Sequence, residues 1–350
     1  MSTHIYLTID FGSTYTKLTA IDLDKEEIVA TSRAMTTVKT DVLIGFNEAF
    51  EILENDFTTL QVMDWPMVQG YLQRCKYEES NHNIINMIMW LQTYPLFYYK
   101  REEYLLLLGI HEGCFFMYMP LCEKQYIAEA ITKGKEIFDH YGHDFTLSCF
   151  TKEMVDEVIK LYPEYTAIHE SWADDYVYDG ERLRTYAGKK MQKKRNHLNA
   201  FYKDYEGRWS YETLDETNID DCIGYLKDWK SEDPDDFLQS ERIGTFRILD
   251  LYDELPCKGG LIRIDGKVRA FAIGSMLSDR MCQENIEKAD GDVRGLYQCI
   301  MKEMLSHEFP SIELVNREDD TGRENLRAAK LSYHPVNIIE KYRIKKGVES

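Results

Sequence analysis

The chain has 350 residues, of which 44% are hydrophobic and 29% charged, a balance that excludes wholesale disorder and suits one large domain or two ordinary ones. Its 42 basic and 61 acidic residues give a net charge of −19, which excludes a globally basic nucleic-acid-binding protein. The eight cysteines form no C-x-x-C pair and no zinc-binding spacing, so we predict no metal site and reduced thiols in a cytoplasmic protein. Neither a signal peptide nor about 18 uninterrupted apolar residues is found, so no integral membrane segment is expected.

The N-terminal segment predicts a β-meander, with strands at 5–9, 18–22 and 28–31. The turn after the first strand is rich in Gly, Ser and Thr, and it therefore exposes backbone N–H groups and hydroxyls that can hold a phosphate. An ordinary polar hairpin turn is the alternative. The residues that would hold a nucleotide are Asp10, Gly12, Ser13, Thr14 and Lys17.

Mixed α and β patterns follow from about residue 58. Helices and strands are predicted, in chain order, at 63–75 (helix), 81–92 (helix), 96–99, 104–110 and 114–119 (strands), 123–140 (helix), 145–149 (strand) and 152–161 (helix). The aromatic segment at 172–178 is predicted to be irregular.

A similar order recurs after Gly188, which favours a duplicated α/β unit. It comprises a helix at 188–205, a strand at 208–214, helices at 219–230 and 235–252, a hairpin of strands 261–264 and 267–273 around Asp265-Gly266, a strand at 281–287, a helix at 294–306, a strand at 312–315, a helix at 322–333 with Thr321 and Glu324 as its capping box, and a strand at 336–344.

A basic segment in this acidic chain runs from Gly188 to His197. At about 100° per residue its lysines share one arc of the predicted helix, and Leu198 and Phe201 occupy the adjoining arc. A cationic stripe beside a buried face suits the phosphate groups of a nucleotide, a tRNA or an anionic lipid. A solvated helix face balanced by neighbouring acids is the alternative. The cations of the stripe are Lys189, Lys190, Lys193, Lys194 and Arg195.

Polar and acidic residues run from Asn316 to Gly322, where a predicted strand ends and a helix begins. Ligands of α/β folds bind at such strand ends, although the helix dipole alone also explains carboxylates there. Glu318 beside Arg317 is either an interior ion pair or a general base. Arg323, Arg327 and Lys330 are expected along one helix face, and Leu326, Ala329 and Tyr333 are expected to face the sheet.

A third segment, at 287–297, joins a strand to a helix through two glycines, Gly291 and Gly295. Free N–H groups at a helix start bind anions or an oxyanion. Trp172, Tyr176 and Tyr178 either line a pocket or pack in the core.

These segments together resemble the family named for the C-terminal domain of phosphatidylglycerol lysyltransferase, over about residues 58–346. The residues that carry the resemblance are Trp172-x-x-Asp175-Tyr176-x-Tyr178, Gly188-Lys189-Lys190, Lys194-Arg195-Asn196, Phe201, Ala270-Phe271-x-Ile273-Gly274, Glu287-Lys288-Ala289, Gly295-x-Tyr297, Asn316-Arg317-Glu318-Asp319-Asp320-x-Gly322, Leu326-Arg327-x-Ala329-Lys330-Leu331-Ser332-Tyr333-x-Pro335 and Lys341-Tyr342.

The resemblance implies an α/β fold with mixed sheets, arranged as two tandem GNAT-like acyltransferase domains at 57–187 and 188–350 after a β-meander fragment at 1–56. It also implies transfer of an aminoacyl group from aminoacyl-tRNA to a lipid, amine or hydroxyl acceptor. The membrane half of the lysyltransferase is not matched, and the repeated glycines of an acetyl-CoA loop are absent. We therefore favour aminoacyl-tRNA over acyl-CoA as the donor, held by a local basic patch, and leave the acceptor and the oligomeric state open.

For this reaction we expect the five cations of the stripe to clamp the donor. Glu318 or Asp319 would be the base, Arg317 or Arg327 the charge stabiliser and Tyr333 the acid. Further substrate contacts are expected from Asn196, Arg294, Gly295, Tyr297, Asn316, Arg327 and Lys330. A non-catalytic binding module that keeps the fold and the stripe is the rival interpretation.

The segment from Asp10 to Lys17, with Thr36-Thr37-Val38-Lys39, resembles the opening of the accessory ATPase of glutamate mutase, a member of the actin/Hsp70/sugar-kinase superfamily. That resemblance places Asp10, Gly12, Ser13, Thr14 and Lys17 in the first phosphate loop. The superfamily needs two lobes and further loops, so we predict a fused fragment that does not hydrolyse ATP. A nucleotide-binding accessory protein is the alternative.

Overall fold

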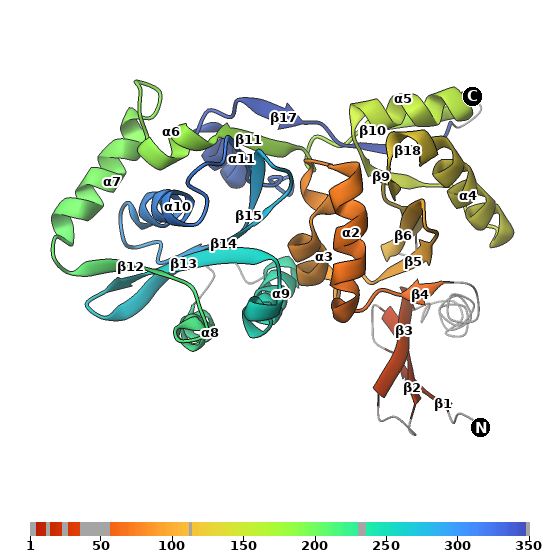
Figure 1. Ribbon diagram of the computed structural model, residues 1–350, viewed down its shortest axis with the longest axis horizontal. Helices are drawn as coiled ribbons and strands as arrows, with labels where there is room; N and C mark the ends of the chain where they lie inside the picture. The colour runs from red at the N-terminus through yellow and green to blue at the C-terminus, as the bar shows by residue number, and fades with distance from the viewer. Residues whose placement is uncertain are drawn as a thin grey trace. The chain divides into compact units, whose positions relative to one another are not determined.

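The computed structural model describes residues 5–11, 15–22, 27–35, 57–111, 114–229 and 236–347 (Figure 1). The chain divides into two compact units: unit 1 is Met1–Cys75, Leu91–Ile168 and Tyr342–Ser350, and unit 2 is Lys76–Trp90 and His169–Lys341. Each unit contains one large mixed sheet with helices, and a small sheet precedes them. The predicted fold class is confirmed.

The small sheet is the predicted meander, with order β1-β2-β3 and bounds Ile5–Phe11, Tyr15–Asp22 and Glu27–Met35. Its neighbouring strands are antiparallel, and Asp10 lies opposite Lys17 in the register. Residues 12–14 of the predicted phosphate loop lie outside the described residues. The nucleotide site therefore stays a prediction.

Unit 1 is built on an 8-stranded sheet with order β10-β18-β9-β7-β6-β5-β4, and β8 pairs with β6. The central strand β6 carries the run Leu105–Leu108, which is fully buried. The elements of unit 1 are β4 (Thr58–Thr59), η1 (Val62–Asp64), α2 (Trp65–Cys75), β5 (Leu96–Lys100), β6 (Tyr104–His111), β7 (Cys114–Met117), β8 (Leu121–Cys122), η3 (Lys124–Tyr126), α4 (Ile127–His140), β9 (Leu147–Phe150), α5 (Lys152–Leu161), β10 (Tyr165–His169) and β18 (Tyr342–Lys346).

Unit 2 is built on a 7-stranded sheet with order β12-β13-β14-β15-β16-β11-β17. Helix α10 packs on one face of this sheet with α6 and α7 against it, and α8 and α9 cover the other face, where α3 packs on α9 (Figure 1). The elements of unit 2 are η2 (Ser80–His82), α3 (Ile84–Trp90), β11 (Asp175–Asp179), α6 (Gly180–Thr185), α7 (Gln192–Asp204), β12 (Trp209–Thr213), α8 (Ile219–Asp228), α9 (Asp236–Asp250), η4 (Tyr252–Glu254), β13 (Cys257–Ile264), β14 (Lys267–Met276), β15 (Met281–Ala289), α10 (Leu296–His307), β16 (Leu314–Asn316), α11 (Glu324–Leu331) and β17 (Asn337–Ile339).

Two predictions about strands are wrong. The segment at 172–178 contains β11, which lies between β16 and β17 and is almost wholly buried. Tyr176 and Tyr178 are therefore sheet residues, whereas Trp172 precedes the strand and is exposed. The predicted strand at 336–344 is two strands, β17 and β18, which belong to different sheets. Lys341 lies between the two strands in the sequence and belongs to neither. Its fully buried ammonium group bonds to Asp175, Ser80 and Asn81.

The predicted starts of two helices also differ from the structure. Helix α7 begins at Gln192 rather than Gly188, so Lys189 and Lys190 lie in the preceding turn. Helix α11 begins at Glu324 without a capping box: the hydroxyl of Thr321 is buried without a hydrogen-bond partner. The carboxylates of Asp319 and Asp320 accept the N–H groups of Thr321 and Gly322 instead.

The orientation of α11 differs from the predicted one. Leu326 and Ala329 are exposed, whereas Arg327 pairs with the buried Asp320 and Lys330 turns inward to backbone carbonyls. Only Tyr333, just beyond the helix, is buried as expected. Satisfying buried charges outweighs burying one leucine at this position.

The compact units divide the chain at other places than the predicted ranges 57–187 and 188–350. Residues 76–90 belong to unit 2 because polar bonds tie them to its sheet. Asn83 donates to Ser275, and the backbone N–H and hydroxyl of Ser80 both bond to Asp175. Gly244 of α9 lies directly against Met89 of α3, where a Cβ atom would clash with the Met89 carbonyl.

The hairpin around Asp265-Gly266 is confirmed, with φ values of 50° and 77° at these two residues, as a type I′ turn requires. Within the described residues, no helix combines the length and the apolar composition that crossing a bilayer requires.

Candidate active site

The candidate site lies where β16 ends beside β15 in unit 2. The two strands pair in parallel only from Met281 to Gln283, opposite Leu314 to Asn316. β16 ends at Asn316 while β15 continues to Ala289. Arg317 and Glu318 therefore leave the strand end beside a stretch of β15 that no strand pairs on that side within the described residues.

A β-bulge in β15 sets which of its side chains share a face. The register with β14 shifts between Ile273, opposite Ile286, and Gly274, opposite Glu284. Because strand residues alternate between faces, Glu284 and Glu287 would otherwise lie on opposite faces, and the extra residue brings them to one face. Both carboxylates reach the same guanidinium group there: the Arg317 Nε contacts Glu284, and its Nη2 lies 2.8 Å from Glu287.

Two further side chains complete this group, which we call the Arg317 cluster: Arg317, Glu284, Glu287, Lys194 and Tyr333. The Lys194 Nζ lies 3.7 Å from the centre of the Tyr333 ring, and the Arg317 guanidinium carbon lies 4.9 Å from the same centre. Helix α7 supplies Lys194, and the turn after α11 supplies Tyr333. Gln298 of α10 donates to the Tyr333 hydroxyl at 2.8 Å, so that hydroxyl keeps its own proton free to donate.

Burial shifts the pKa values of several residues in the cluster. Burial and the neighbouring Glu284 raise the pKa of Glu287 to about 8. Burial, with repulsion from Arg317 and Lys193, lowers the pKa of Lys194 to about 8. Burial also raises the pKa of Tyr333, which therefore stays a neutral donor at ordinary pH. Such shifts are typical of catalytic or ligand-binding clusters.

One oxygen of the cluster has no partner. The Glu284 side chain is 5% exposed, and its Oε1 is buried without a hydrogen bond, although Oε2 pairs with Arg317. A buried unsatisfied carboxylate oxygen costs free energy, so a ligand that donates to it would bind favourably.

Glu318 lies on the other face of the sheet, apart from the Arg317 cluster. Its Oε1 accepts from the Gln283 Nε2 at 2.5 Å, and Gln283 and Glu284 are successive strand residues that point to opposite faces. Burial raises the pKa of Glu318 to about 8, with Asp319 and Asp175 as further causes. The backbone of Glu318 is left-handed, with φ 60°.

A buried network supports that backbone. The Asn316 Oδ1 accepts the Glu318 N–H at 2.8 Å, and its Nδ2 donates to Asp175 at 2.9 Å. The Asp175 carboxylate in turn accepts from Lys341 at 2.7 Å. Asn316 is thus a buried structural residue here and not an exposed substrate contact.

The other predicted residues near the strand end also bind the protein itself. Asp319 accepts the Thr321 N–H, and burial raises its pKa. Arg327 pairs with Asp320 at 2.7 Å. The Lys330 Nζ donates to the carbonyls of Arg317 and Glu318, which links the two faces.

The structure brings one of the five predicted stripe cations into the cluster, namely Lys194. Arg195 donates to the carbonyls of Tyr186 and Gly188 and so fixes the turn before α7. Asn196 is exposed on α7. Lys189, Lys190 and Lys193 are exposed, and no carboxylate of the described residues lies within ion-pairing distance of them.

The start of α10 adjoins the same helix. Gly295 caps α10 with φ 86°, and a Cβ atom there would lie 2.2 Å from the His197 carbonyl oxygen of α7. Arg294 is exposed, and together with burial it lowers the pKa of His197. Burial raises the pKa of the half-buried Tyr297 to about 12.

Sequence reasoning missed Glu284 and Glu287 as site residues. The signal was present, because Gln283, Glu284, Asn285 and Glu287 are polar residues inside a strand that is otherwise buried. The bulge that brings the two glutamates together has no such signature in the sequence.

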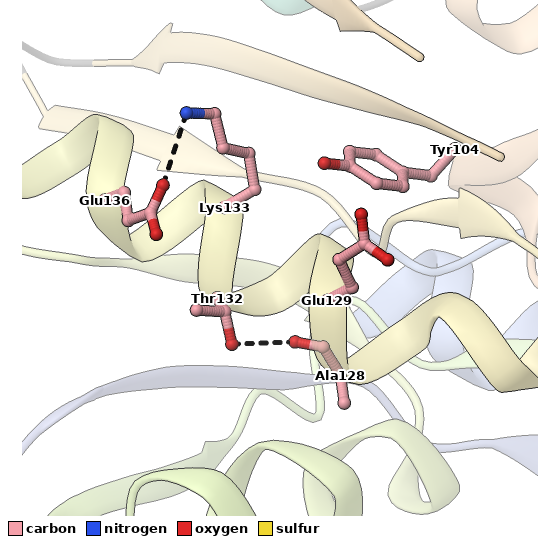
Figure 2. A pocket seen from close by; sticks show the side chains of 6 residues that line it. All are labelled: Tyr104, Ala128, Glu129, Thr132, Lys133 and Glu136. Atoms are coloured by element: carbon pink, nitrogen blue, oxygen red, sulfur yellow. Dashed lines mark hydrogen bonds and ion pairs between the residues drawn. The ribbon is translucent and has the colours of Figure 1, made fainter. Parts of the chain in front are cut away.

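Two surface pockets lie in unit 1 and contain none of the predicted site residues. Figure 2 shows one of about 390 Å³, lined by Tyr104, Ala128, Glu129, Thr132, Lys133 and Glu136, in which Lys133 pairs with Glu136 at 3.2 Å. The other has about 630 Å³ and lies at Tyr71, Arg74, Lys100, Arg101 and Glu102.

The raised pKa values predict how stability depends on pH. The pKa values of Glu287 and Glu318 are raised from 4.5 to about 8 by folding. Between pH 4.5 and about 8 the folded chain therefore binds more protons than the unfolded chain. The free energy of unfolding should therefore fall as pH rises through this window. Urea unfolding across the window, compared with Glu287→Gln, measures this contribution: the variant should gain stability relative to the unchanged protein as pH rises. A difference that stays constant with pH would contradict it.

The contact of Gly295 with α7 predicts a large cost for a small side chain. Gly295→Ala should lower the free energy of unfolding by about 2–3 kcal/mol, because alanine must adopt a left-handed backbone and meets the His197 carbonyl. Gly291→Ala is the matched control, since nothing lies within 4 Å of a Cβ atom there. Equal urea midpoints for the two variants would show that α7 does not pack on Gly295.

Comparison with known proteins gives two family matches. Residues 73–345 match the family described as phosphatidylglycerol lysyltransferase, C-terminal, and residues 6–78 match the family described as MutL protein. An uncharacterized protein of Mycoplasmoides gallisepticum is 30% identical over 190 residues, which are 54% of this chain and 61% of that protein. A protein named MutL from Clostridium tetanomorphum is 56% identical over 48 residues, which are 14% of this chain and 10% of that protein. The matches thus span less than two thirds of either relative.

Solved structures agree with the first match. A conserved protein of unknown function from Bacteroides thetaiotaomicron superposes with a TM-score of 0.76 at 25% identity, covering 83% of this chain and 99% of that one. The L-PGS structure from Bacillus licheniformis has a TM-score of 0.60 at 11% identity, covering 81% and 92%, and so shares the fold. The family match covers most of the chain, and the two-sheet architecture agrees with it: the chain belongs to the phosphatidylglycerol lysyltransferase C-terminal family.

Proposed function

We propose that this chain transfers an aminoacyl group from aminoacyl-tRNA to an amine or hydroxyl acceptor, with the reaction at the Arg317 cluster. The proposal is supported by the match to the phosphatidylglycerol lysyltransferase C-terminal family and by the fold shared with the L-PGS structure. The observation that carries the choice of acyl group is the buried, unpartnered Oε1 of Glu284.

The Glu284 oxygen favours a donor that carries an ammonium group. An α-ammonium group has three N–H donors and a positive charge, so it would satisfy this oxygen and also relieve the repulsion between Glu284 and Glu287. A plain acetyl group offers neither donor nor charge. An aminoacyl ester therefore fits the cluster better than an acetyl thioester.

The cations beside the cluster favour a polyanionic carrier for that acyl group. Lys189, Lys190 and Lys193 are exposed next to Lys194 and lack ion-pair partners among the described residues. These three cations form a local positive patch in a chain whose net charge is −19, and RNA phosphates can bind at such a patch. The α10 start offers less to a CoA pyrophosphate, since Gly295 is covered by the α7 backbone.

The reaction steps use groups that lie on the cluster's face of the sheet. Glu287, whose pKa burial raises to about 8, accepts the acceptor's proton while the nucleophile bonds to the ester carbonyl carbon. Glu318 lies on the other face and takes no part in this step. Arg317 and Lys194 stabilise the resulting oxyanion. The ester C–O bond then breaks, and Tyr333 donates its proton to the 3′-oxygen of the departing tRNA. Its hydroxyl suits this role because Gln298 occupies its acceptor side.

The test is the lifetime of the ester. The purified chain is incubated with a mixture of charged tRNAs and an extract of cytosolic metabolites and lipids, and the loss of the aminoacyl ester is followed. We expect faster loss with at least one amino acid, and loss of that acceleration in Glu284→Gln. Unaltered ester lifetimes together with tight tRNA binding would favour the rival, a non-catalytic binding module.

A further inference from the structure

A second polar feature lies in unit 1, on the surface between the last turn of α2 and the β5–β6 turn. It is the pocket of about 630 Å³ lined by Tyr71, Arg74, Lys100, Arg101 and Glu102. None of these residues belongs to the Arg317 cluster or to the basic stripe.

Hydrogen bonds hold the backbone of this pocket in place. The hydroxyl of Tyr71, which is buried, donates to the Arg101 carbonyl, and the Arg74 Nη1 donates to the Glu102 carbonyl at 2.9 Å. The Arg74 guanidinium also lies 4.1 Å from the centre of the Tyr71 ring. These contacts fasten the β5–β6 turn to α2, so the pocket is preformed rather than assembled by a ligand.

The charges around the pocket are unbalanced. Three cations, Arg74, Lys100 and Arg101, face one carboxylate, Glu102, and no described carboxylate lies within ion-pairing distance of any of the three. Some lysines elsewhere on unit 1 pair with acids on their own helices, as Lys135 does with Asp139 and Lys160 with Glu157. The three cations around the pocket instead add local positive charge to a chain whose net charge is −19.

We propose that this pocket binds two adjacent phosphate groups, either a pyrophosphate group of a nucleotide or successive phosphodiesters of RNA. Guanidinium groups bind phosphate oxygens through paired N–H donors, and Arg74 is already oriented by the Tyr71 ring. Lys100 and Arg101 are exposed where β5 ends and the turn begins, so they can reach a second phosphate. The lysine would contribute a positive charge and the arginine paired N–H donors. The pocket is a separate site from the Arg317 cluster, and it stands whether or not the chain transfers an aminoacyl group.

The test is calorimetric titration of the full chain with inorganic pyrophosphate and, separately, with a short single-stranded RNA, each at low and high salt. We expect at least one of the two probes to bind, with affinity that falls as salt rises. Lys100→Gln/Arg101→Gln should weaken that binding about tenfold or more, since two charge-assisted contacts are lost. Lys135→Gln/Lys160→Gln removes the same charge from unit 1 away from the pocket and should leave the affinity nearly unchanged.

The two probes distinguish the sources of the phosphate. Pyrophosphate binding that the pocket variant weakens supports a nucleotide ligand, and binding of RNA alone that the same variant weakens supports an RNA backbone. Binding of neither probe, or equal weakening by the pocket variant and the control, would overturn the proposal. Lys100→Gln/Arg101→Gln removes side chains that make none of the contacts fastening the turn to α2, so it should weaken binding without lowering the thermal midpoint of the chain. That result separates recognition from folding.

Discussion

Arg317→Ala is expected to lower the free energy of unfolding by about 3–5 kcal/mol, because removing the arginine leaves the buried carboxyl groups of Glu284 and Glu287 without their partner. The Arg317 side chain is only 12% exposed, and it compensates Glu284 and Glu287, which are 5% and 15% exposed. Urea unfolding of the purified variant measures the loss.

Two controls separate this cause from loss of packing. Arg269→Ala removes an arginine that also pairs with two acids, Asp290 and Asp292, but at a site where Arg269 is 33% exposed, and it should cost less than about 1 kcal/mol. Adding Glu284→Gln and Glu287→Gln to Arg317→Ala should recover much of the stability, since the buried charges are then gone. No recovery in the triple variant would mean that the arginine acts mainly through its aliphatic packing.

Lys194→Gln is expected to reduce the proposed aminoacyl transfer about 100-fold while leaving stability unchanged or slightly higher. Its ammonium group lies at the Tyr333 ring, where the ester carbonyl oxygen would develop charge. Because burial and Arg317 lower the pKa of Lys194 to about 8, the folded state disfavours its charge, and replacing it removes an unfavourable term. Single-turnover transfer and urea unfolding on the same preparation measure both effects.

Lys203→Gln is the matched control, since Lys203 is exposed on the same helix and the charge change is identical. It should leave both the transfer rate and the stability near those of the unchanged chain. If the two variants slow transfer equally, Lys194 acts only through the overall charge of α7, and the assignment to the cluster fails.

Local patterns were sufficient to predict much of the fold. The hydrophobic periodicity predicted α5 with its observed bounds, and Asp265-Gly266 predicted the β13–β14 hairpin. The features that have no local pattern depend on distant contacts. Residues 76–90 join unit 2 through Ser80 and Asn83, and β17 and β18 separate because Lys341 is buried between them, and neither contact has a local pattern.

The residues of the candidate site likewise divide into those with a local sequence signal and those that depend on distant contacts. Lys194, Arg317 and Tyr333 were identified because charge and strand-end position are visible in the sequence, and the structure brings these three together. The sequence suggests Glu318 as a partner of Arg317 because the two are neighbours. In the structure Arg317 pairs with Glu284 and Glu318 bonds to Gln283, and these successive strand residues point to opposite faces. Glu284 and Glu287 share a face only because of the bulge in β15.

The central claim is that an aminoacyl group docks with its ammonium group at Glu284. Its most direct measurement is the affinity of the chain for tRNA carrying an amide-linked, non-hydrolysable aminoacyl group, compared with the same tRNA after N-acetylation. The account predicts tighter binding of the free ammonium form by about tenfold or more, and loss of that preference in Glu284→Gln. Equal affinity for the two forms in the unchanged chain would contradict it.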